Sequence, residues 1–290
     1  MFTDMFGNKR YKINFHTHTT VSDGRVSPEE SAKVYRQAGY DAIAVTDHWV
    51  FSAGGTTENL PILSGCEYNF GTDPVTDPVY HILAILPDRD PEVERTDSPQ
   101  MCIDKIIRAG GLPVLAHPAW SLNDPEKVMK LTGIEFTEIH NTVSGKHASN
   151  RPYSGAFVDM MACRGTYFGL LATDDTHYYD GDEATASIMI MADSLCPEDL
   201  RRALKAGDYY ATTGPELHAF VRDGIIEIYC SPCVTVDVFT NACWAKDHHN
   251  EGENLTHVIV PLKETDRFVR VEVTDQEGRT AYSNTVVIEK

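Results

Sequence analysis

Five segments of the chain begin with proline and end next to glycine, and this pattern limits the folds that the sequence can adopt. The pairs are Pro28 and Gly39, Pro99 and Gly110, Pro125 and Gly133, Pro152 and Gly165, and Pro197 and Gly207. Proline is tolerated at the first helical position, and glycine accepts the left-handed conformation that follows many helices. The first segment adds a capping box, with Ser27 at the N-cap and Glu30 three residues later. Each pair therefore predicts one helix.

Short apolar runs alternate with these predicted helices. They are YKINF, DAIAVT, VYHILAIL, LPVLAH, IEFTEI, YFGLLAT and ASIMIM. Near-continuous apolar strands that alternate with helices are typical of a parallel sheet buried on both faces. The pattern predicts an α/β fold for residues 1–213, either a barrel or a doubly wound sheet.

The pattern changes after the sequence TTGP at residues 212–215. The segments IIEIY, VTVDVF, THVIVPL, RFVRVEVTD and NTVVIEK follow without a convincing helix between them. We therefore expect residues 214–290 to form a small antiparallel β appendage.

Seven irregularly spaced cysteines fit a reducing compartment better than a disulfide framework. Only Cys230 and Cys233 have the spacing of zinc ligands, and Cys243 with His248 or His249 could complete such a set. A turn between two strands is the favoured interpretation of this pair, because apolar alternation flanks it.

Composition excludes several classes of protein. No apolar run approaches the roughly 20 residues of a membrane span, and the first residues lack the features of a secretory signal, so we expect a cytoplasmic protein without a membrane partner. The chain has 290 residues and a net charge of −18, which argues against binding a long nucleic acid. A small anionic substrate is still allowed, because bound metal ions would dominate the local charge.

Histidines and acids recur at or beside the carboxyl ends of the predicted strands. They are His16, His18, Asp47, His48, Glu67, His81, His117, Asp174, Asp175 and His177. In an α/β barrel these ends form the rim on which sites are built. Taken singly, His81 would be interpreted as a core histidine and Asp23-Gly24 as a turn. The repetition favours a metal site, because burying so many charges without metal would be very costly.

Several of these motifs resemble, in order, those of the PHP (polymerase and histidinol phosphatase) superfamily of metal-dependent phosphoesterases. The motifs are HTHTTVSDG, VTDH, GCEYNF, the strand that contains His81, LAHPAW and DDTH. The resemblance covers about residues 10–213. It implies a distorted barrel of seven βα units that carries a cluster of up to three metal ions.

The resemblance also implies a ligand set. His16, His18, Glu67 and Asp175 would bind the first metal. Glu67 would bridge to the second metal, which His81 and His117 would also bind. Asp23, His48 and His177 would bind the third. Some family members have histidine where this chain has Asp23. Imidazole and carboxylate ligands suit zinc, iron or manganese, so we expect two or three such divalent ions.

These ligands predict a reaction. Two metals bridged by Glu67 and a water would generate a hydroxide nucleophile near neutral pH, and we expect Glu67, Asp175 and His177 to be catalytic. The expected activity is that of a phosphoesterase acting on a small phosphomonoester, or on the end of a nucleotide or oligonucleotide. A carbamate or ester hydrolase that uses the same metals is the alternative, because TTGP and GRTAYSN resemble the ending of a branch that includes aryl-carbamate hydrolases. A non-enzymatic module with a vestigial cluster is disfavoured, since all nine positions hold competent ligands.

Residues next to the ligands have less specific signals. Asp47, Asp174 and Ser22 could orient imidazoles, although caps or turn residues explain them equally well. Four residues could bind the substrate phosphate: Arg25, Lys146, His147 and Arg151. A solvated loop is the favoured alternative for the last three. The sequence does not predict an oligomeric state.

Overall fold

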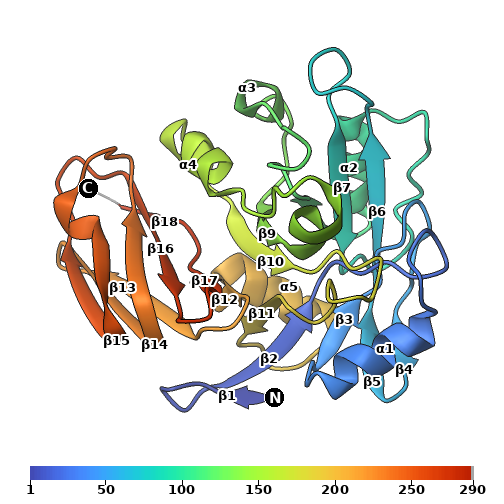
Figure 1. Cartoon of the computed structure of the whole chain (residues 1–290). Helices are drawn as coiled ribbons and strands as arrows, with labels where there is room; N and C mark the ends of the chain where they lie inside the picture. The colour runs from blue at the N-terminus through green and yellow to red at the C-terminus, as the bar shows by residue number, and fades with distance from the viewer. Residues whose placement is uncertain (289–290) are drawn as a thin grey trace.

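Each of the five segments that proline and glycine bracket contains a helix in the computed structural model, which describes residues 1–288 (Figure 1). The helices are α1 (Pro28–Gln37), α2 (Pro99–Arg108), α3 (Pro125–Val128), α4 (Gly155–Cys163) and α5 (Pro197–Ala206). The expectation that Pro152 is the first residue of its helix is wrong, because that helix begins at Gly155. At α1 the Ser27 side chain accepts a hydrogen bond from the Glu30 backbone N–H, which confirms this part of the predicted cap. At the end of α5, Gly207 adopts the left-handed conformation.

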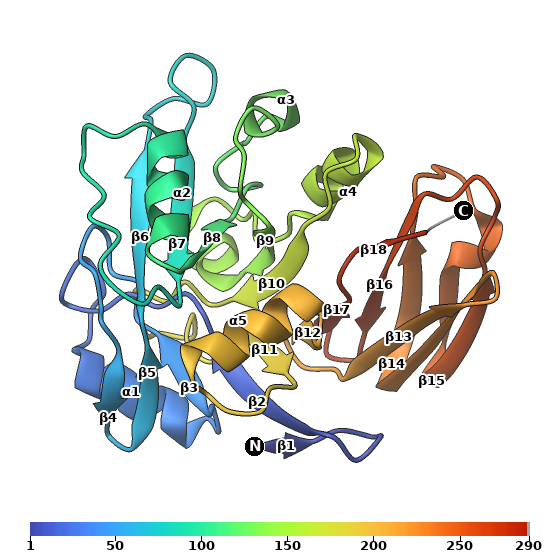
Figure 2. The same ribbon diagram turned by 180° about the vertical axis from the view of Figure 1, so that it is seen from behind.

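One sheet contains five strands in the order β10-β9-β8-β7-β6. The strands are β6 (Gly65–Phe70), β7 (Tyr80–Ile85), β8 (Leu112–Leu115), β9 (Phe136–Asn141) and β10 (Gly169–Thr173). The helix α2 packs against β7 and β8 (Figure 2). This sheet supplies the buried face on which much of the apolar core rests.

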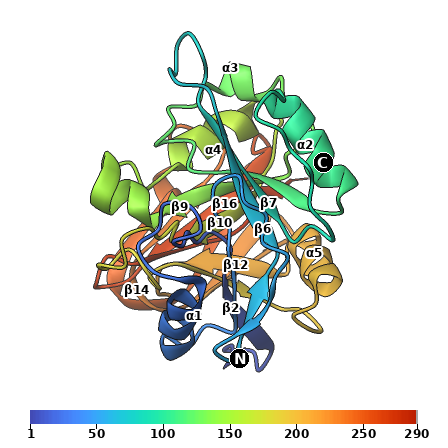
Figure 3. The ribbon, with the colours of Figure 1, turned by 90° about the vertical axis from the view of Figure 1, so that its right-hand side faces the viewer.

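A second sheet follows the order β13-β14-β16-β17-β12-β11-β2-β3-β5-β4. The first four of these are C-terminal strands: β13 (Leu217–Arg222), β14 (Ile225–Phe239), β16 (Phe268–Thr274) and β17 (Thr280–Tyr282). Its strands outside the C-terminal region are β2 (Lys9–Asn14), β3 (Ala42–Ala44), β4 (Gly55–Thr57), β5 (Leu60–Leu63), β11 (Ser187–Ile190) and β12 (Tyr209–Thr212), and β1 (Phe2–Thr3) pairs with β2. Figure 3 shows α1 and α5 on either side of β2. Isolated bridges join the two sheets, one between His48 and Glu67 and another between Thr17 and Thr176.

The mixed α/β class is confirmed, but the strands are less regular than the sequence predicts. The strands β2, β3 and β5 are parallel to one another, as are β8, β9 and β10. In contrast, β7 is antiparallel to both β6 and β8, and β11 is antiparallel to β2. No helix separates β6 from β7, so these two strands can form a hairpin rather than a parallel crossover. The expectation of a wholly parallel sheet is therefore wrong.

The predicted barrel remains a prediction. Over residues 1–288 the ladders form two sheets that isolated bridges connect, not one closed ring of paired strands. The elements still bring the ends of β2, β3, β8 and β10 to one region, which is the property on which the site depends.

The C-terminal region contains antiparallel strands, as predicted. They are β13 (Leu217–Arg222), β14 (Ile225–Phe239), β15 (His249–Pro261), β16 (Phe268–Thr274), β17 (Thr280–Tyr282) and β18 (Val286–Val287). Their apolar cluster also includes Met189 of β11 and Tyr210 of β12, and β17 pairs with β12. The boundary at residues 213 and 214 remains a prediction.

Cys230 and Cys233 are buried within β14, where the register against β15 shifts. The interpretation of this pair as a turn between two strands is wrong, because one long strand runs through both residues. No group of metal-capable side chains within residues 1–288 includes either cysteine. Among the described residues, no helix combines the length and the apolar character that crossing a membrane requires.

Candidate metal centre

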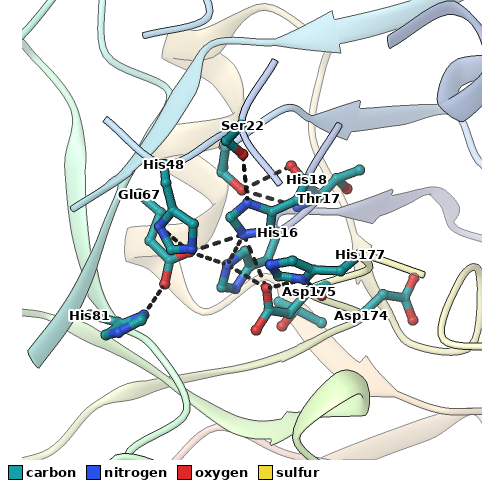
Figure 4. A network of polar contacts seen from close by, with 12 residues as sticks. His16, Thr17, His18, Ser22, His48, Glu67, His81, Asp174, Asp175 and His177 are labelled. Carbon is teal, nitrogen blue, oxygen red and sulfur yellow. Dashed lines mark hydrogen bonds and ion pairs between the residues drawn. The ribbon is translucent and has the colours of Figure 1, made fainter. Parts of the chain in front are cut away.

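The structure brings all nine predicted metal ligands together in three adjoining groups. Figure 4 labels His16, His18, His48, Glu67, His81, Asp175 and His177 among them. His16 and His18 follow β2, His48 follows β3, His117 follows β8, and Asp175 and His177 follow β10, whereas Glu67 and His81 lie within β6 and β7. Two of these residues have a positive φ angle: 29° at His117 and 53° at Asp175. Such angles are uncommon outside glycine, so the fold holds these two residues in strained positions.

The first group consists of His16, His18, Glu67 and Asp175, all of which are buried. The Nε2 atom of His16 lies 3.1 Å from Nε2 of His18, 3.1 Å from Oε2 of Glu67 and 3.0 Å from Oδ1 of Asp175. The Nε2 atom of His18 lies 2.9 Å from the same Glu67 oxygen and 3.1 Å from the same Asp175 oxygen. Four polar atoms from separate parts of the chain therefore surround one point.

This arrangement fits a metal ion. A tetrahedral ion with bonds of about 2.0 Å separates its ligand atoms by about 3.3 Å, close to the spacing of the four atoms. In addition, Oδ1 of Asp175 is buried and has no contact of hydrogen-bond geometry within residues 1–288. A buried oxygen without a donor is costly, and a cation at the centre of the group would satisfy it.

Glu67 connects the first group to the second, which consists of Glu67, His81 and His117. Its Oε2 atom faces His16 and His18, whereas its Oε1 atom lies 2.7 Å from Nδ1 of His81 and 3.4 Å from Nε2 of His117. This division of the two oxygens is the geometry that a bridging carboxylate needs.

The third group consists of Asp23, His48 and His177, together with His18. The closest Asp23 oxygens lie 3.6 Å from Nε2 of His177 and 3.8 Å from Nε2 of His48, and the Asp23 side chain is 55% exposed. The adjacent Gly24 lets the loop turn here, since a Cβ atom at this position would lie 2.6 Å from the carbonyl of His18. The third group is therefore looser and more open than the first.

Electrostatics in the first group are dominated by close pairs of opposite charge. Burial lowers the pKa of His18, but the close negative charges of Asp175 and Glu67 outweigh this effect and raise it to about 9. Burial raises the pKa of Glu67, but His16, His48 and His81 hold it well below its usual range. Divalent ions would compete with protons for these histidines.

The three residues expected to orient imidazoles have other contacts. The Asp47 carboxylate accepts hydrogen bonds from the backbone N–H groups and hydroxyls of Thr19 and Ser22, so it fixes the loop that follows His18. Asp174 points away from the cluster and accepts from Tyr35 and Thr185 (Figure 4). Only Ser22 approaches a predicted ligand, with its Oγ atom 3.5 Å from Nδ1 of His18.

Sequence reasoning missed Glu138. This carboxylate is not a predicted ligand itself, but it contacts the imidazole of a residue that is. Glu138 in β9 is fully buried, and its Oε1 atom lies 2.7 Å from Nδ1 of His16. The residue lies in an apolar run, IEFTEI, one of whose two acids is partly exposed. One signal in the sequence could have identified Glu138: it is an acidic residue in a strand that is expected to be buried on both faces.

A pocket opens onto the three groups. Its walls outside the predicted ligands are Trp120, Val143, Ser144 and Tyr178. None of the four predicted substrate-binding residues lines it: Arg25, Lys146, His147 and Arg151. Two of them contact Tyr178, which forms one wall of the pocket. The Arg25 guanidinium lies 4.6 Å from the Tyr178 ring centroid, and the centroid of the His147 ring lies 4.2 Å from it.

The other two predicted substrate-binding residues lie near this wall or on the surface. Lys146 donates a hydrogen bond to the backbone carbonyl of Asp180, and Arg151 is exposed and donates its backbone N–H to Ser144. Their role in binding a substrate stays a prediction.

Comparisons with known proteins agree with this architecture. No protein-family model matches the chain. An uncharacterised protein of Methanocaldococcus jannaschii is 28% identical over an alignment 145 residues long, which covers 44% of this chain and 83% of that protein.

Solved structures resemble the chain at low sequence identity. A two-domain protein from Bacteroides vulgatus, described as containing a predicted PHP-like metal-dependent phosphoesterase, has a TM-score of 0.55 and 14% identity, covering 99% of this chain and 97% of the other. The lesion-specific endonuclease PfuEndoQ from Pyrococcus furiosus has a TM-score of 0.47 and 13% identity, covering 68% of this chain and 56% of the other. The chain thus shares its fold, over nearly its whole length, with the two-domain protein from Bacteroides vulgatus.

Proposed function

We propose that this chain is a hydrolase that uses two or three divalent transition-metal ions to cleave a phosphoester. The substrate would be a small phosphomonoester, or the end of a nucleotide or oligonucleotide. The observation that carries the proposal is the first group, in which His16, His18, Glu67 and Asp175 direct four buried atoms at one point. The fold shared with the Bacteroides vulgatus protein supports the same reaction class.

The nine ligands form three sets within this proposal. His16, His18, Glu67 and Asp175 would hold one ion, Glu67, His81 and His117 a second, and Asp23, His48 and His177 a third. When bound, zinc, iron or manganese ions would supply a bridging hydroxide as the nucleophile and offset charge on the phosphoryl oxygens.

Three side chains are assigned as catalytic. Glu67 faces both the first and the second group and so fixes their spacing. Asp175 contacts both histidines of the first group. His177 lies at the open side of the cluster, where its partly exposed ring can reach a substrate that enters the pocket.

The pocket walls suit a small substrate. Trp120 and Tyr178 supply apolar faces, and Ser144 supplies a hydroxyl between the cluster and the loop that follows β9. Arg25 would add positive charge next to Tyr178, where it could draw in a phosphate group, and His147 lies against the same ring. A net charge of −18 supports the further expectation that no long nucleic acid binds. We also propose that the protein acts in the cytoplasm without a membrane partner.

A paired assay tests the reaction class. Metal-loaded protein would be given nucleoside monophosphates, short oligonucleotides and aryl carbamates, with His16→Ala as the inactive control. We expect release of phosphate from a nucleoside monophosphate, or of a nucleotide from an oligonucleotide, and the loss of this activity in the variant. Hydrolysis of carbamates alone would refute the proposal and favour the alternative that the TTGP and GRTAYSN motifs suggest.

A further inference from the structure

Glu138 is not one of the nine predicted ligands, but it lies within hydrogen-bond distance of a ligand imidazole. Among the described residues, no other carboxylate outside the ligand set does so. Glu138 lies in the middle of β9, and its side chain has no exposed surface. Its charged partner in the described part of the chain is His16. An isolated buried carboxylate is strongly unfavourable, so this position calls for a physical reason.

Four donors surround the two oxygens of Glu138. Oε1 accepts from Nδ1 of His16 at 2.7 Å and from the Thr173 hydroxyl at 2.6 Å. Oε2 accepts from the His117 backbone N–H at 2.8 Å and from Nδ2 of Asn141 at 2.8 Å. The carboxylate is thus fully satisfied by groups from three separate segments of the chain.

These contacts reach three predicted ligands. His16 is bound through its ring and His117 through its backbone. Asn141 donates both to Glu138 and, at 3.1 Å, to Oδ2 of Asp175. Glu138 therefore contacts ligands of both the first and the second group, either directly or through one amide.

The contact with His16 fixes the chemistry of its ring. A carboxylate at Nδ1 keeps the proton on that nitrogen, so that the lone pair of Nε2 points away from Glu138. The Nε2 atom is the one that lies 3.0 Å from Oδ1 of Asp175 and 3.1 Å from Nε2 of His18. The tautomer that Glu138 selects is the one that can bind a metal at the centre of the first group.

We propose that Glu138 is a positioning residue of the metal centre: it selects the Nδ1–H tautomer of His16 and holds His16, His117 and Asp175 at the spacing that the ions require. This inference rests on the proposed function, because it assumes that the nine ligands bind metal. A purely structural role would tie β9 to its neighbours without affecting the affinity for metal.

The test compares Glu138→Gln with Thr137→Val. Thr137 is the neighbouring buried residue of β9, and its hydroxyl donates to the Leu115 carbonyl, so Thr137→Val disturbs the same strand without removing a contact of Glu138. The first measurement is a zinc titration of the full chain against a competing chelator. The second is the NMR signal of the His16 Nδ1–H proton in the zinc-loaded protein.

We expect Glu138→Gln to weaken binding of one zinc equivalent about 10- to 100-fold and to shift or abolish the His16 Nδ1–H signal. Thr137→Val should do neither. The inference is overturned if Glu138→Gln binds zinc as tightly as Thr137→Val and keeps the proton signal. If the unaltered protein binds no metal, the proposed function itself fails, which is a different result from a metal-binding protein that is indifferent to Glu138.

A second variant covers the case in which Glu138→Gln does not fold, since its amide would face the donors of His117 and Asn141. Thr173→Val removes one hydrogen bond to Oε1 of Glu138 and leaves the charge in place. We expect it to weaken binding of the same zinc equivalent about 2- to 10-fold, as the loss of one hydrogen bond would. Unchanged zinc affinity in Thr173→Val, together with an unshifted His16 Nδ1–H signal, would count against the inference.

Discussion

The Nε2 atoms of His16 and His18 lie 3.1 Å apart, in a position that is closed to solvent. The two nitrogens can form a hydrogen bond with each other only if one carries a proton and the other does not. The carboxylates of Glu67 and Asp175 approach both nitrogens at a similar distance, so one proton cannot serve the whole group. A divalent cation satisfies all four atoms together.

The first prediction is that the purified protein contains two or three equivalents of zinc, iron or manganese, and that His16→Ala loses at least one of them. The physical reason is that His16 supplies one of four atoms around a single point. Elemental analysis by mass spectrometry measures the content. His249→Ala is the matched control, because His249 is exposed and pairs only with Asp237 and Glu251. A metal-free, folded protein would exclude the cluster.

The second prediction concerns removal of the metal. Ligands that bind only the folded state stabilise it, by about 3 kcal/mol when their concentration is a hundred times the dissociation constant. A strong chelator should therefore lower the free energy of unfolding by at least this amount, as measured by urea denaturation with and without chelator. In His16→Ala the difference between the two curves should shrink. Identical curves for the unaltered protein would contradict the prediction.

The third prediction separates the third group from the other two. Asp23→Ala should lose one metal equivalent and about 100-fold in phosphoesterase activity, while the other equivalents remain, because the imidazoles that Asp23 contacts among the described residues, His18, His48 and His177, all belong to its own group. Asp23→His should keep the equivalent, since imidazole is also a competent ligand. Metal content and activity are measured on both variants. Loss of all metal in Asp23→Ala would show that the three groups do not bind independently.

The sequence predicted the nine clustered residues because their signal is local and repeated. His16 and His18 are two residues apart in an extended segment, which places both rings on one side. Most of the other ligands follow a strand, and strand ends that meet at one edge bring their side chains together. The helices were predicted for a similar reason, because Pro28 fixes its own φ angle and Gly39 readily adopts the left-handed conformation that it has after α1.

Other features depend on partners that are distant in the sequence. The antiparallel pairing of β11 with β2 joins residues as far apart in the sequence as Ile188 and Ile13. Glu138 differs from an ordinary acid only through its contact with His16, which is 122 positions away. The contact between Arg270 and Asp159 joins the C-terminal strands to α4 and spans 111 positions. Periodicity and spacing carry no information about such pairs.

The fourth prediction concerns this last contact. The side chain of Arg270 is fully buried, and its Nε and Nη2 atoms donate to the two Asp159 oxygens at 2.7 and 2.8 Å. It also contacts the Glu272 carboxylate and lies over the ring of Phe239. Arg270→Met would leave two acids without their partner, so we expect a loss of about 3–5 kcal/mol in the free energy of unfolding.

The control for this prediction is Arg279→Met. Arg279 also contacts two acids, Asp275 and Glu277, but its side chain is 49% exposed. Exposed ion pairs contribute little, so we expect a loss below about 1 kcal/mol. Urea denaturation of the two variants gives both values. Equal losses would mean that burial does not determine the contribution of these pairs.

The fifth prediction is a pH dependence of stability that arises from His140. Burial lowers the pKa of His140 to about 4, although the negative charge of Glu138 opposes this effect. The unfolded chain binds a proton here near pH 6.5, whereas the folded chain does so only near pH 4. Stability is therefore lost as the pH falls below about 6.5, and the loss is complete near the folded pKa.

For this single group the shift corresponds to a loss of about 2 kcal/mol between pH 7 and pH 5. His140→Gln keeps a polar side chain beside Thr142 but removes the titration. Both proteins are denatured with urea at pH 7, 6 and 5, in the presence of a chelator that removes the effects of metal. The difference between them isolates the contribution of His140 to the pH dependence, because all other titrating groups are common to the two proteins. The free energies should converge or cross as the pH falls, with the unaltered protein losing more. If the two proteins lose the same amount, His140 is not buried as a neutral ring.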